Sequence, residues 1–255
     1  MSQLDNKSAQ PDSSCLIEKL SQFIDLSGVD KDLLATLEKS SQQFDRHEQV
    51  WGVDTQLENM YVVKQGWLIT YTILQDGRRQ VLELHYPGDV IGSSDIPFRH
   101  ATSNLMAVEP CVLCPFPKSA IDVIFRESPR LTALIFTLAM IDKSINLDRI
   151  RILGRMSARE RLAHILLEIH SRLSLTGGVS KNQYRLPLSQ FDLGDAVGLT
   201  NVSVSNGLTH LEEDGLISRS KGMVELKNID RLTKLSDYIN RYHEVDISWF
   251  PDAST

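Results

Sequence analysis

The segment that most constrains the fold of this chain is LPLSQFDLGDAVGLTNVSVSNGLTHLEEDGLI, residues 186–217. Ser189 is followed three residues later by Asp192, a capping-box spacing that begins a helix. Gly198 then allows the positive φ that a sharp turn requires, and Thr200 is suited to cap a second helix. The segment therefore predicts two short helices joined by a tight turn.

The second of these helices separates its apolar side chains from its polar ones. Val204, Leu208 and Leu211 share one face, and Gly194 leaves room for the two helices to cross closely. The exposed N-terminal end then carries Asn201, Val202, Ser203, Ser205 and Asn206. In a helix-turn-helix this end enters the major groove, where Asn bonds adenine, Ser bonds several base edges and Val packs on the thymine methyl. An αα-hairpin of an unrelated helical domain is the alternative, and the coincidence of caps, glycines and core spacing favours the DNA-binding motif.

A two-stranded wing follows, with residues 216–219 and 223–226 on either side of the turn 220–222. The net charge of −6 argues against DNA binding by bulk electrostatics. From Ser157 onward the sequence contains 11 Lys and Arg and 13 Asp and Glu, which gives a net charge of about −2. Any DNA contact must therefore use a thin basic patch. Beside the reading helix, the residues expected to contact DNA are Lys181, Arg185, Ser189, Thr200, Arg219 and Lys221.

Residues 44–116 show a different pattern, with period-two stretches rich in Val, Ile, Leu, Tyr and Thr. The stretches are separated by turn residues, and Asp76-Gly77 is a strong hairpin signal because glycine accepts positive φ. Two helical patterns, at residues 15–24 and 29–44, precede them. This part of the chain predicts a small antiparallel roll of short strands, flanked by short helices.

A long helix is expected from Ser128, a capping residue, and Pro129, which suits a first helical turn. An apolar stripe in three-four steps, broken only by Asp148, comprises Leu131, Leu134, Leu138, Ile141, Ile145 and Ile152. The stripe predicts the seam of a symmetric dimer, and a core helix lying on its own β-domain is the alternative. Residues 156–158 interrupt the pattern before another amphipathic helix begins.

These patterns together predict an α+β fold with a jelly-roll-like N-terminal β-roll, a long dimerisation helix and a C-terminal winged helix-turn-helix. The expected divisions are a disordered arm 1–14, the roll with its helices 15–127, the helix and hinge 128–156, and the DNA-binding domain 157–255. No secretory signal or membrane span is expected, since the longest apolar run is too short to cross a bilayer. Three cysteines cannot make a dense disulfide framework. We expect a reducing, cytoplasmic compartment.

With these parts in order, the chain resembles the CRP/FNR family of transcription regulators from about Cys15 to Tyr242. That family's cyclic-nucleotide-binding-type roll is similar to the stretch YVVKQGWLITYTILQDGRRQVLELHYPGDVIG. Its DNA-binding signature is similar to LPLSQFDLGDAVGLT and LEEDGLI. The resemblance implies a homodimer that reads palindromic double-stranded DNA and contacts RNA polymerase. It also implies a small-molecule effector in or near the roll.

The departures from the family narrow these implications. Gly92 is followed by Ser93 where cyclic-AMP-binding members have Glu, and Arg99-His100 only partly imitates the phosphate end, so we do not expect cyclic AMP. The candidate effector residues are chosen only by the position of the family's effector pocket, and they are Gly92, Ser93, Arg99 and His100. Only Cys15 lies in the arm that supplies three cluster ligands in oxygen-sensing members, so no iron–sulfur cluster and no other cofactor is expected.

The reading helix departs as well, because uncharged Val202, Ser205 and Asn206 stand where many members have charged base readers. Without an arginine to bond guanine, the helix is expected to read a half-site different from the common one and richer in A·T. An effector-binding protein whose helix-turn-helix mediates protein contacts is the first alternative function.

Two other motifs invite a chemical interpretation. Cys111 and Cys114 lie three apart on a strand and so on opposite faces, which favours buried structural cysteines over a thiol switch or zinc site. Glu83 and His85 share one face and resemble a fragment of a cupin metal strand, but no further ligand lies at metal-binding spacing. We therefore expect no enzyme and no metal, with a cupin-like metal enzyme as the second alternative.

Overall fold

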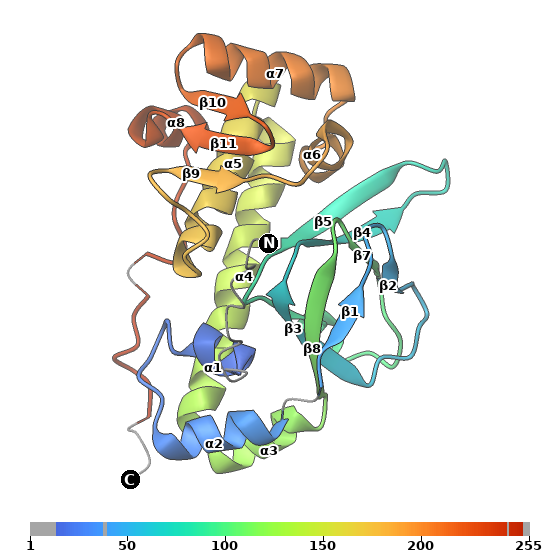
Figure 1. Ribbon diagram of the computed structural model, residues 1–255, viewed down its shortest axis with the longest axis vertical. Coiled ribbons are helices and arrows are strands. Elements are labelled where there is room, and N and C mark those ends of the chain that lie inside the picture. Colours follow the sequence, from blue (N-terminus) through green and yellow to red (C-terminus); the bar gives the residue numbers. More distant parts are fainter. Residues whose placement is uncertain (1–13, 38–39, 244, 252–255) are drawn as a thin grey trace, which may run out of the picture.

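The computed structural model describes residues 14–37, 40–243 and 245–251 and is shown in Figure 1. Two short helices, α1 (Cys15–Leu20) and α2 (Gly28–Leu37), precede the first strand, as the helical patterns predict. The predicted disordered arm 1–14 lies outside the described residues except for Ser14, whose side chain caps α1. Among the helices described, none is long and apolar enough to cross a membrane.

Eight strands form the N-terminal β-roll from two four-stranded sheets, ordered β1-β8-β3-β6 and β2-β7-β4-β5, with all pairs antiparallel. This confirms the predicted antiparallel roll. The strands are β1 (Gln42–Phe44), β2 (Gln49–Trp51), β3 (Asn59–Gln65), β4 (Leu68–Ile73), β5 (Arg79–His85), β6 (Val90–Ile91), β7 (Asn104–Ala107) and β8 (Cys111–Pro117). A 3₁₀ turn, η1 (Ser93–Asp95), follows β6.

Two turns of the roll depend on glycine. Gly77 has φ +85° in the hairpin between β4 and β5, which confirms the turn expected at Asp76-Gly77. Gly66, with φ +87°, leaves no space for a side chain, because an added Cβ would lie 2.6 Å from the carbonyl oxygen of Pro110. These backbone conformations explain why the strands end where they do.

The two cysteines of β8 are buried on opposite faces of the strand, as predicted. Cys111 packs in a cluster with Leu113 and Trp51, whereas Cys114 packs with Phe116 in a second cluster. Burial raises the pKa of the Cys111 thiol to about 11, so the thiolate is disfavoured at neutral pH.

A long helix joins the two halves of the molecule. After α3 (Ala120–Glu127), the helix α4 runs from Pro129 to Arg155 over 27 residues. Ser128 caps it by accepting a hydrogen bond from the backbone N–H of Leu131 at 3.2 Å, and the same hydroxyl donates to Asp30 of α2 at 2.7 Å. The predicted start of this helix is therefore confirmed.

The stripe predicted as a dimer seam points the other way, toward the core of its own chain. Five members, Leu131, Leu134, Ile141, Ile145 and Ile152, are 9% exposed or less, and Leu138 is half-buried. Leu131 and Leu134 pack into the cluster formed with α1, α2 and α3. The seam prediction for these residues is corrected, because their side chains are buried within their own chain.

The opposite face of α4 carries a second apolar series that remains exposed. Phe136, Met140, Leu147 and Ile150 are 57%, 40%, 58% and 67% exposed. Their spacing of four, seven and three residues keeps them on one side of a helix. We call these four residues the exposed stripe of α4.

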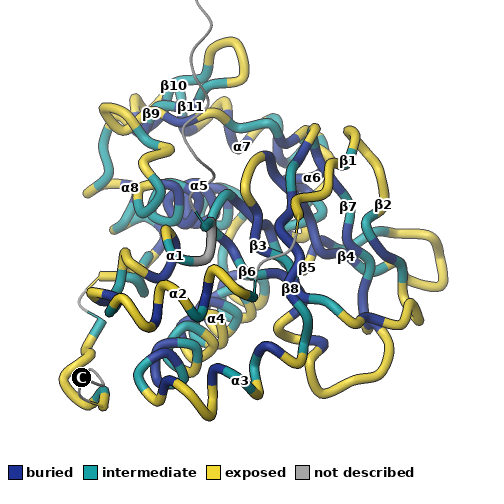
Figure 2. The backbone as a smooth tube through the Cα atoms, turned by 60° about the horizontal axis from the view of Figure 1, so that its bottom comes forward, coloured by how far each residue is buried: buried dark blue, intermediate teal, exposed yellow. Residues whose placement is uncertain are grey.

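The C-terminal domain is built around the amphipathic helix α5, which is largely dark blue in Figure 2. Ser157 and Glu160 begin α5 with a capping box, where the sequence predicts a break after α4. Leu162, Ile165 and Ile169 are fully buried at its centre. The elements are α5 (Ala158–Leu175), β9 (Gln183–Arg185), α6 (Gln190–Val197), α7 (Asn201–Glu213), β10 (Ile217–Ser220), β11 (Met223–Leu226) and α8 (Ile229–Ser236).

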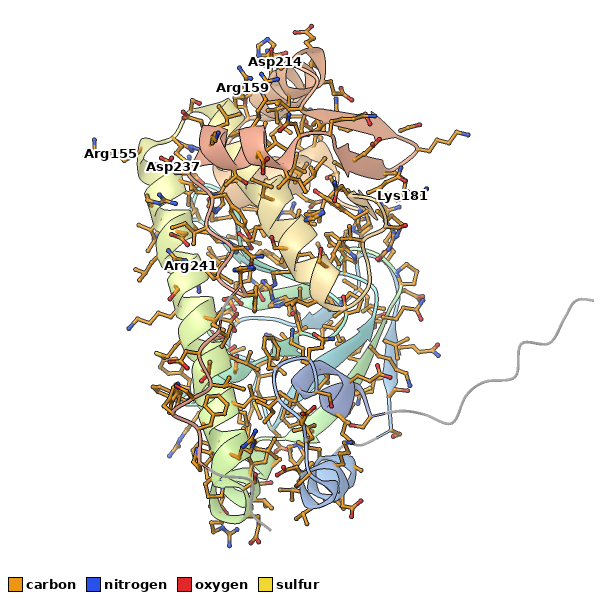
Figure 3. All side chains as sticks on the ribbon, turned by 90° about the vertical axis from the view of Figure 1, so that its left-hand side faces the viewer. Arg155, Arg159, Lys181, Asp214, Asp237 and Arg241 are labelled. Carbon is orange, nitrogen blue, oxygen red and sulfur yellow. The ribbon has the colours of Figure 1, made fainter. Side chains whose placement is uncertain are left out.

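After α8 the chain turns at Asp237, with φ +44°, and runs along α4 toward α2 (Figure 1). Arg241 pairs with Asp148 of α4 at 2.7 Å, and Asp237 and Arg241 both lie beside that helix in Figure 3. Further on, Phe250 packs against the core cluster of α1, α2 and α3. We call residues 237–243 and 245–251 the C-terminal strap.

Candidate functional site

The predicted helix-turn-helix is present as α6, a tight turn and α7. Ser189 and Asp192 form a capping box at the start of α6, in which the Asp192 backbone N–H donates to the Ser189 hydroxyl at 3.1 Å. Gly198 ends α6 in the left-handed region, with φ +64°. A Cβ at Gly194 would lie 2.6 Å from the Leu199 carbonyl oxygen, so only glycine allows this approach of the turn to α6.

Helix α7 buries one face and presents the other. Thr200 caps it, accepting a hydrogen bond from the Ser203 backbone N–H at 3.2 Å, while Val204 and Leu211 are fully buried. The predicted base-reading side chains lie at its N-terminal end. Val202 and Asn206 are exposed, and Asn201, Ser203 and Ser205 are half-buried.

Two of the four predicted DNA-contacting cations carry carboxylate partners. Arg219 donates to Glu212 of α7 at 2.7 Å, and Arg185 forms a short bidentate pair with Glu109 of the roll. Lys181 and Lys221 are exposed, and Lys181 lies at the edge of the domain in Figure 3. The cationic patch of this domain is therefore thinner than its residue count indicates, because a contact to phosphate would have to displace Glu212 or Glu109.

The roll also contacts the helix-turn-helix directly, through the hairpin of β4 and β5. Arg79 donates to Asp192 and to Asp195, both at 2.6 Å, and Gln80 donates to the Asp195 carbonyl oxygen at 2.6 Å. Local sequence patterns do not reveal this contact, because Arg79 and Asp192 lie 113 positions apart. The hairpin thereby fixes the orientation of α6 relative to the roll.

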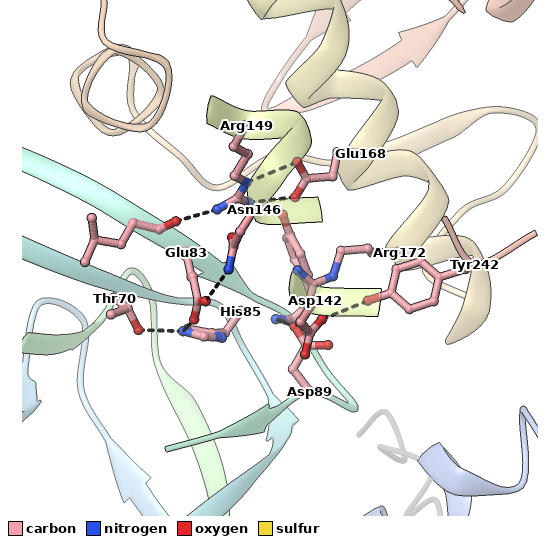
Figure 4. A network of polar contacts seen from close by, with 12 residues as sticks. Thr70, Glu83, His85, Asp89, Asp142, Asn146, Arg149, Glu168, Arg172 and Tyr242 are labelled. Atoms are coloured by element: carbon pink, nitrogen blue, oxygen red, sulfur yellow. Dashed lines mark hydrogen bonds and ion pairs between the residues drawn. The ribbon is translucent and has the colours of Figure 1, made fainter. Parts of the chain in front are cut away.

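A second set of buried charges joins the roll, α1, α4 and α5 (Figure 4). Arg149 of α4 pairs with Glu168 of α5 at 2.6 Å, and Arg172 of α5 pairs with Asp89 of the roll at 2.7 Å. Lys19 of α1 lies 3.5 Å from the same carboxylate. We call these five residues the charged junction. No local sequence pattern marks this set, because its members come from the roll, α1, α4 and α5.

The face of Glu83 and His85 meets polar neighbours from β4 and α4. His85 Nε2 lies 2.7 Å from the Thr70 hydroxyl and 3.8 Å from the Glu83 carboxylate, and Asn146 donates to Glu83 at 3.5 Å. Burial lowers the pKa of His85, which favours the neutral ring. Within the described ranges, no group of three or more His, Cys, Asp or Glu side chains is arranged to hold a metal ion.

Two cavities lie between α4 and the roll. The first, about 110 Å³, extends toward α1 and α3, and the second, about 350 Å³, lies beside Glu83 and Asn146. Of the predicted effector residues, Ser93 lines both cavities, and Gly92 adopts φ +90° immediately before it. Arg99 and His100 are exposed and line neither cavity.

The sequence matches two known domain families. Residues 160–235 match the Crp-like helix-turn-helix domain, and residues 41–128 match the cyclic nucleotide-binding domain. An anaerobic regulatory protein of Aggregatibacter actinomycetemcomitans is 26% identical over 88% of this chain and 86% of its own length. The fumarate and nitrate reduction regulatory protein of Escherichia coli K12 is 24% identical over 88% of this chain and 89% of its own.

Solved structures with a similar fold are also known. FixK2 from Bradyrhizobium japonicum is 27% identical, with a TM-score of 0.70 over 77% of this chain and 96% of its own. A CooA mutant from Carboxydothermus hydrogenoformans is 22% identical, with a TM-score of 0.60 over 87% of this chain and 95% of its own. The second likeness concerns the fold alone.

Proposed function

The chain belongs to the CRP/FNR family of transcription regulators, and from that premise we propose that it acts as a homodimer that reads palindromic double-stranded DNA. The observation that carries the proposal is the capped N-terminal end of α7, where Val202 and Asn206 are exposed beside three half-buried polar side chains. An exposed, capped helix end of this kind fits the major groove. A bacterial regulator of this type works in the cytoplasm, where its DNA and RNA polymerase are.

The proposed operator contains A·T pairs where α7 touches the bases. Asn206 offers the bidentate amide that suits adenine, and Val202 offers an apolar contact for the thymine methyl. The experiment is selection of bound sequences from random DNA by the full-length protein, followed by affinity measurements over a range of salt concentrations. A guanine-centred half-site contacted by α7 would contradict the proposed reading.

The role of α7 is tested by a matched pair of variants on the same helix. Asn206→Ala is expected to weaken specific binding by about 1–3 kcal/mol, while binding to random DNA stays the same. Thr209→Ala, also exposed on α7 but farther from its start, is the control and is expected to leave both affinities unchanged. Failure of the protein to form any sequence-specific DNA complex would favour the alternative in which the helix-turn-helix mediates protein contacts.

The proposed dimer contact uses the exposed stripe of α4, replacing the buried stripe that sequence periodicity favours. An exposed apolar series at heptad-like spacing favours pairing with the same helix of a second copy. Trp249 of the C-terminal strap lines a shallow pocket together with Phe136 and Met140, which extends the apolar area.

The dimer proposal is tested by sedimentation of two phenylalanine variants. Phe136→Glu is expected to shift the protein toward monomer, because the charge would be buried at the contact. Phe125→Glu is the control, since Phe125 of α3 is 54% exposed and Phe136 is 57% exposed. Equal behaviour of the two variants would place the dimer contact elsewhere.

The proposed regulation is a signal at the sensor half, residues 15–156, that changes the pose of the DNA-binding half, residues 157–255. An effector alters DNA affinity only if it binds the two poses with different affinity. Three ion pairs support this proposal, because each joins the sensor half to the DNA-binding half. They are formed by Arg79, Arg149 and Arg172.

A further inference from the structure

The C-terminal strap lies outside both matched domains, because the matched helix-turn-helix domain ends at residue 235. Specific contacts nevertheless hold the strap along α4. Arg151 of α4 donates to the Asp237 carbonyl oxygen at 2.9 Å, and Arg241 pairs with Asp148 of α4. The strap is therefore a structural addition to the two family domains, and its own contacts indicate its role.

A shallow pocket of about 270 Å³ lies between the strap and α4. Trp249 lines it from the strap, and Phe136 and Met140 line it from the exposed stripe of α4. Thr137 and Ile141 also line it, and each follows a stripe residue by one position, which is about 100° around the helix axis. The strap therefore runs along one flank of the exposed stripe.

Trp249 is an exposed side chain that the strap holds in place. It is 53% exposed, and its indole Nε1 donates to the Asp246 carbonyl oxygen at 3.1 Å. Its ring meets the ring of Phe250 edge to face, with 4.8 Å between the centroids, and Phe250 packs against the core cluster of α1, α2 and α3. Because the polar atom of Trp249 is satisfied within the strap, the part of the ring left exposed is apolar and preorganised. Tryptophan side chains in this setting often dominate the binding energy of a protein interface.

The exposed stripe of α4 offers little area for a dimer contact by itself. A stable interface takes roughly 800 Å² from each partner. The stripe supplies four side chains, each only partly exposed, and Trp249 is the largest side chain in the pocket beside them. Two-fold pairing of α4 brings the flanks of both stripes into the contact, because the same surface of each copy meets the other. The strap therefore enters the contact together with the flank that it covers.

We propose that the C-terminal strap is a second element of the dimer contact, and that α4 of a second copy of this chain covers Trp249 and the pocket beside it. The inference rests on the proposed function, because the pairing of α4 helices is taken from there. It adds a partner-facing role for residues that lie outside the matched family domains.

The strap connects this contact to the DNA-binding half. It continues from α8, and Tyr238 at its start meets His164 of α5 edge to face, with 5.1 Å between the ring centroids. A second copy seated on Trp249 would therefore hold the sensor half through α4 and the DNA-binding half through the strap. In this arrangement dimerisation and the pose of the DNA-binding half are coupled.

The test uses the fluorescence of the unmodified full-length protein. Of its three tryptophans, Trp51 and Trp67 are 5% and 4% exposed, so acrylamide reaches only Trp249 readily. Sedimentation first gives the concentrations at which the protein is a monomer and a dimer. We expect the readily quenched component to be lost on dimerisation. A dimer in which this component persists unchanged would overturn the proposal.

Three variants measure the contribution of Trp249. Trp249→Ala is expected to weaken the dimer by about tenfold or more, and Trp249→Phe, which keeps an aromatic ring, is expected to retain most of the affinity. Phe98→Ala is the matched control, because Phe98 is 52% exposed but does not line the pocket, and no change is expected. Equal dimer dissociation constants for Trp249→Ala and Phe98→Ala would contradict the role of the strap.

DNA binding by the same samples separates this proposal from the proposed function. A dimer that protects Trp249 but binds no specific DNA contradicts the proposed DNA reading alone. A DNA-binding dimer in which Trp249 stays exposed contradicts the role of the strap alone. A protein that stays monomeric at every concentration contradicts both.

Discussion

The helix-turn-helix and the charged junction achieve their geometry by opposite means. In the helix-turn-helix the contacts are local, such as Asp192 to Ser189 and Ser203 to Thr200, each over three residues. In the charged junction they are remote, and 83 residues separate Arg172 from Asp89. The reading face of α7 can therefore change sequence without disturbing the fold, whereas a change in the charged junction affects the joint between the two halves.

The largest effect is expected at the charged junction, from Glu168→Gln. The Glu168 side chain is 3% exposed and its partner Arg149 is 13% exposed, so the variant leaves a buried guanidinium without its carboxylate. Such a change costs about 3 kcal/mol of unfolding free energy, measured by chemical denaturation. The control is Asp122→Asn, which removes the exposed pair with Arg126 and is expected to cost less than about 0.5 kcal/mol. Equal costs for the two variants would contradict a stabilising role for the charged junction.

The second largest effect is expected from a local change at Gly194, where the backbone leaves no room for a side chain. Gly194→Ala is expected to cost about 2 kcal/mol and to abolish specific DNA binding, because the new Cβ forces α6 and the turn apart. Gly154→Ala in α4 meets open space and is expected to stabilise the helix by about 0.5–1 kcal/mol. Thermal unfolding of both variants checks the pair, and a stable, DNA-binding Gly194→Ala protein would contradict the close approach.

The next largest change in unfolding free energy is expected at the contact between the roll and α6. Arg79→Ala removes two charge-assisted hydrogen bonds from a partly exposed site, which should cost about 1 kcal/mol. Amide hydrogen exchange in α6 is expected to become faster. Arg78→Ala is the neighbouring control, because Arg78 pairs only with Asp76 within the described chain, and no change in α6 is expected. Unaltered exchange in Arg79→Ala would show that this contact does not fix the orientation of α6.

The smallest effect is a pH dependence from Asp142. Its pKa of about 6 in the folded protein lies above the ordinary aspartate value, so ionisation opposes folding. This destabilisation is absent below about pH 4, where the carboxyl is protonated in both the folded and the unfolded protein. It reaches its full size above about pH 6. Neighbouring atoms desolvate the Asp142 carboxyl and so raise its pKa, but the residue as a whole is exposed and solvent screens its charge. Asp142→Asn should therefore stabilise the protein by only about 0.5 kcal/mol at pH 7.5, and by nothing at pH 4. An equal gain at both pH values would contradict this assignment.

Sequence patterns predicted the elements whose contacts are local. The caps at Ser128, Ser189 and Thr200 and the hairpin glycine Gly77 act within a few residues, so the residue types themselves determine the structure. The roll and the helix-turn-helix were predicted on this basis, as was the end of α7 that carries the reading side chains.

Sequence patterns failed where the outcome depended on which surface another element covers. Both faces of α4 carry apolar series, and periodicity alone cannot decide which of Ile145 and Ile150 meets the roll. The pairing of Arg185 with Glu109 was missed for the same reason, because no spacing rule links residues 76 positions apart. The charged junction was missed for the same reason, because Lys19 and Arg172 both meet Asp89 from distant parts of the chain.

The C-terminal strap gives the DNA-binding half a second connection to the sensor half through the chain itself, in addition to the ion pairs between them. One chain connection is the break between α4 and α5 at Met156, and the other is the strap, fixed to α4 by the pair of Arg241 with Asp148. A rigid body attached at one point turns about any axis, whereas one attached at two separated points turns only about the line that joins them. If the ion pairs between the two halves opened, the strap would still leave α7 one axis of rotation, the line that joins the two chain connections.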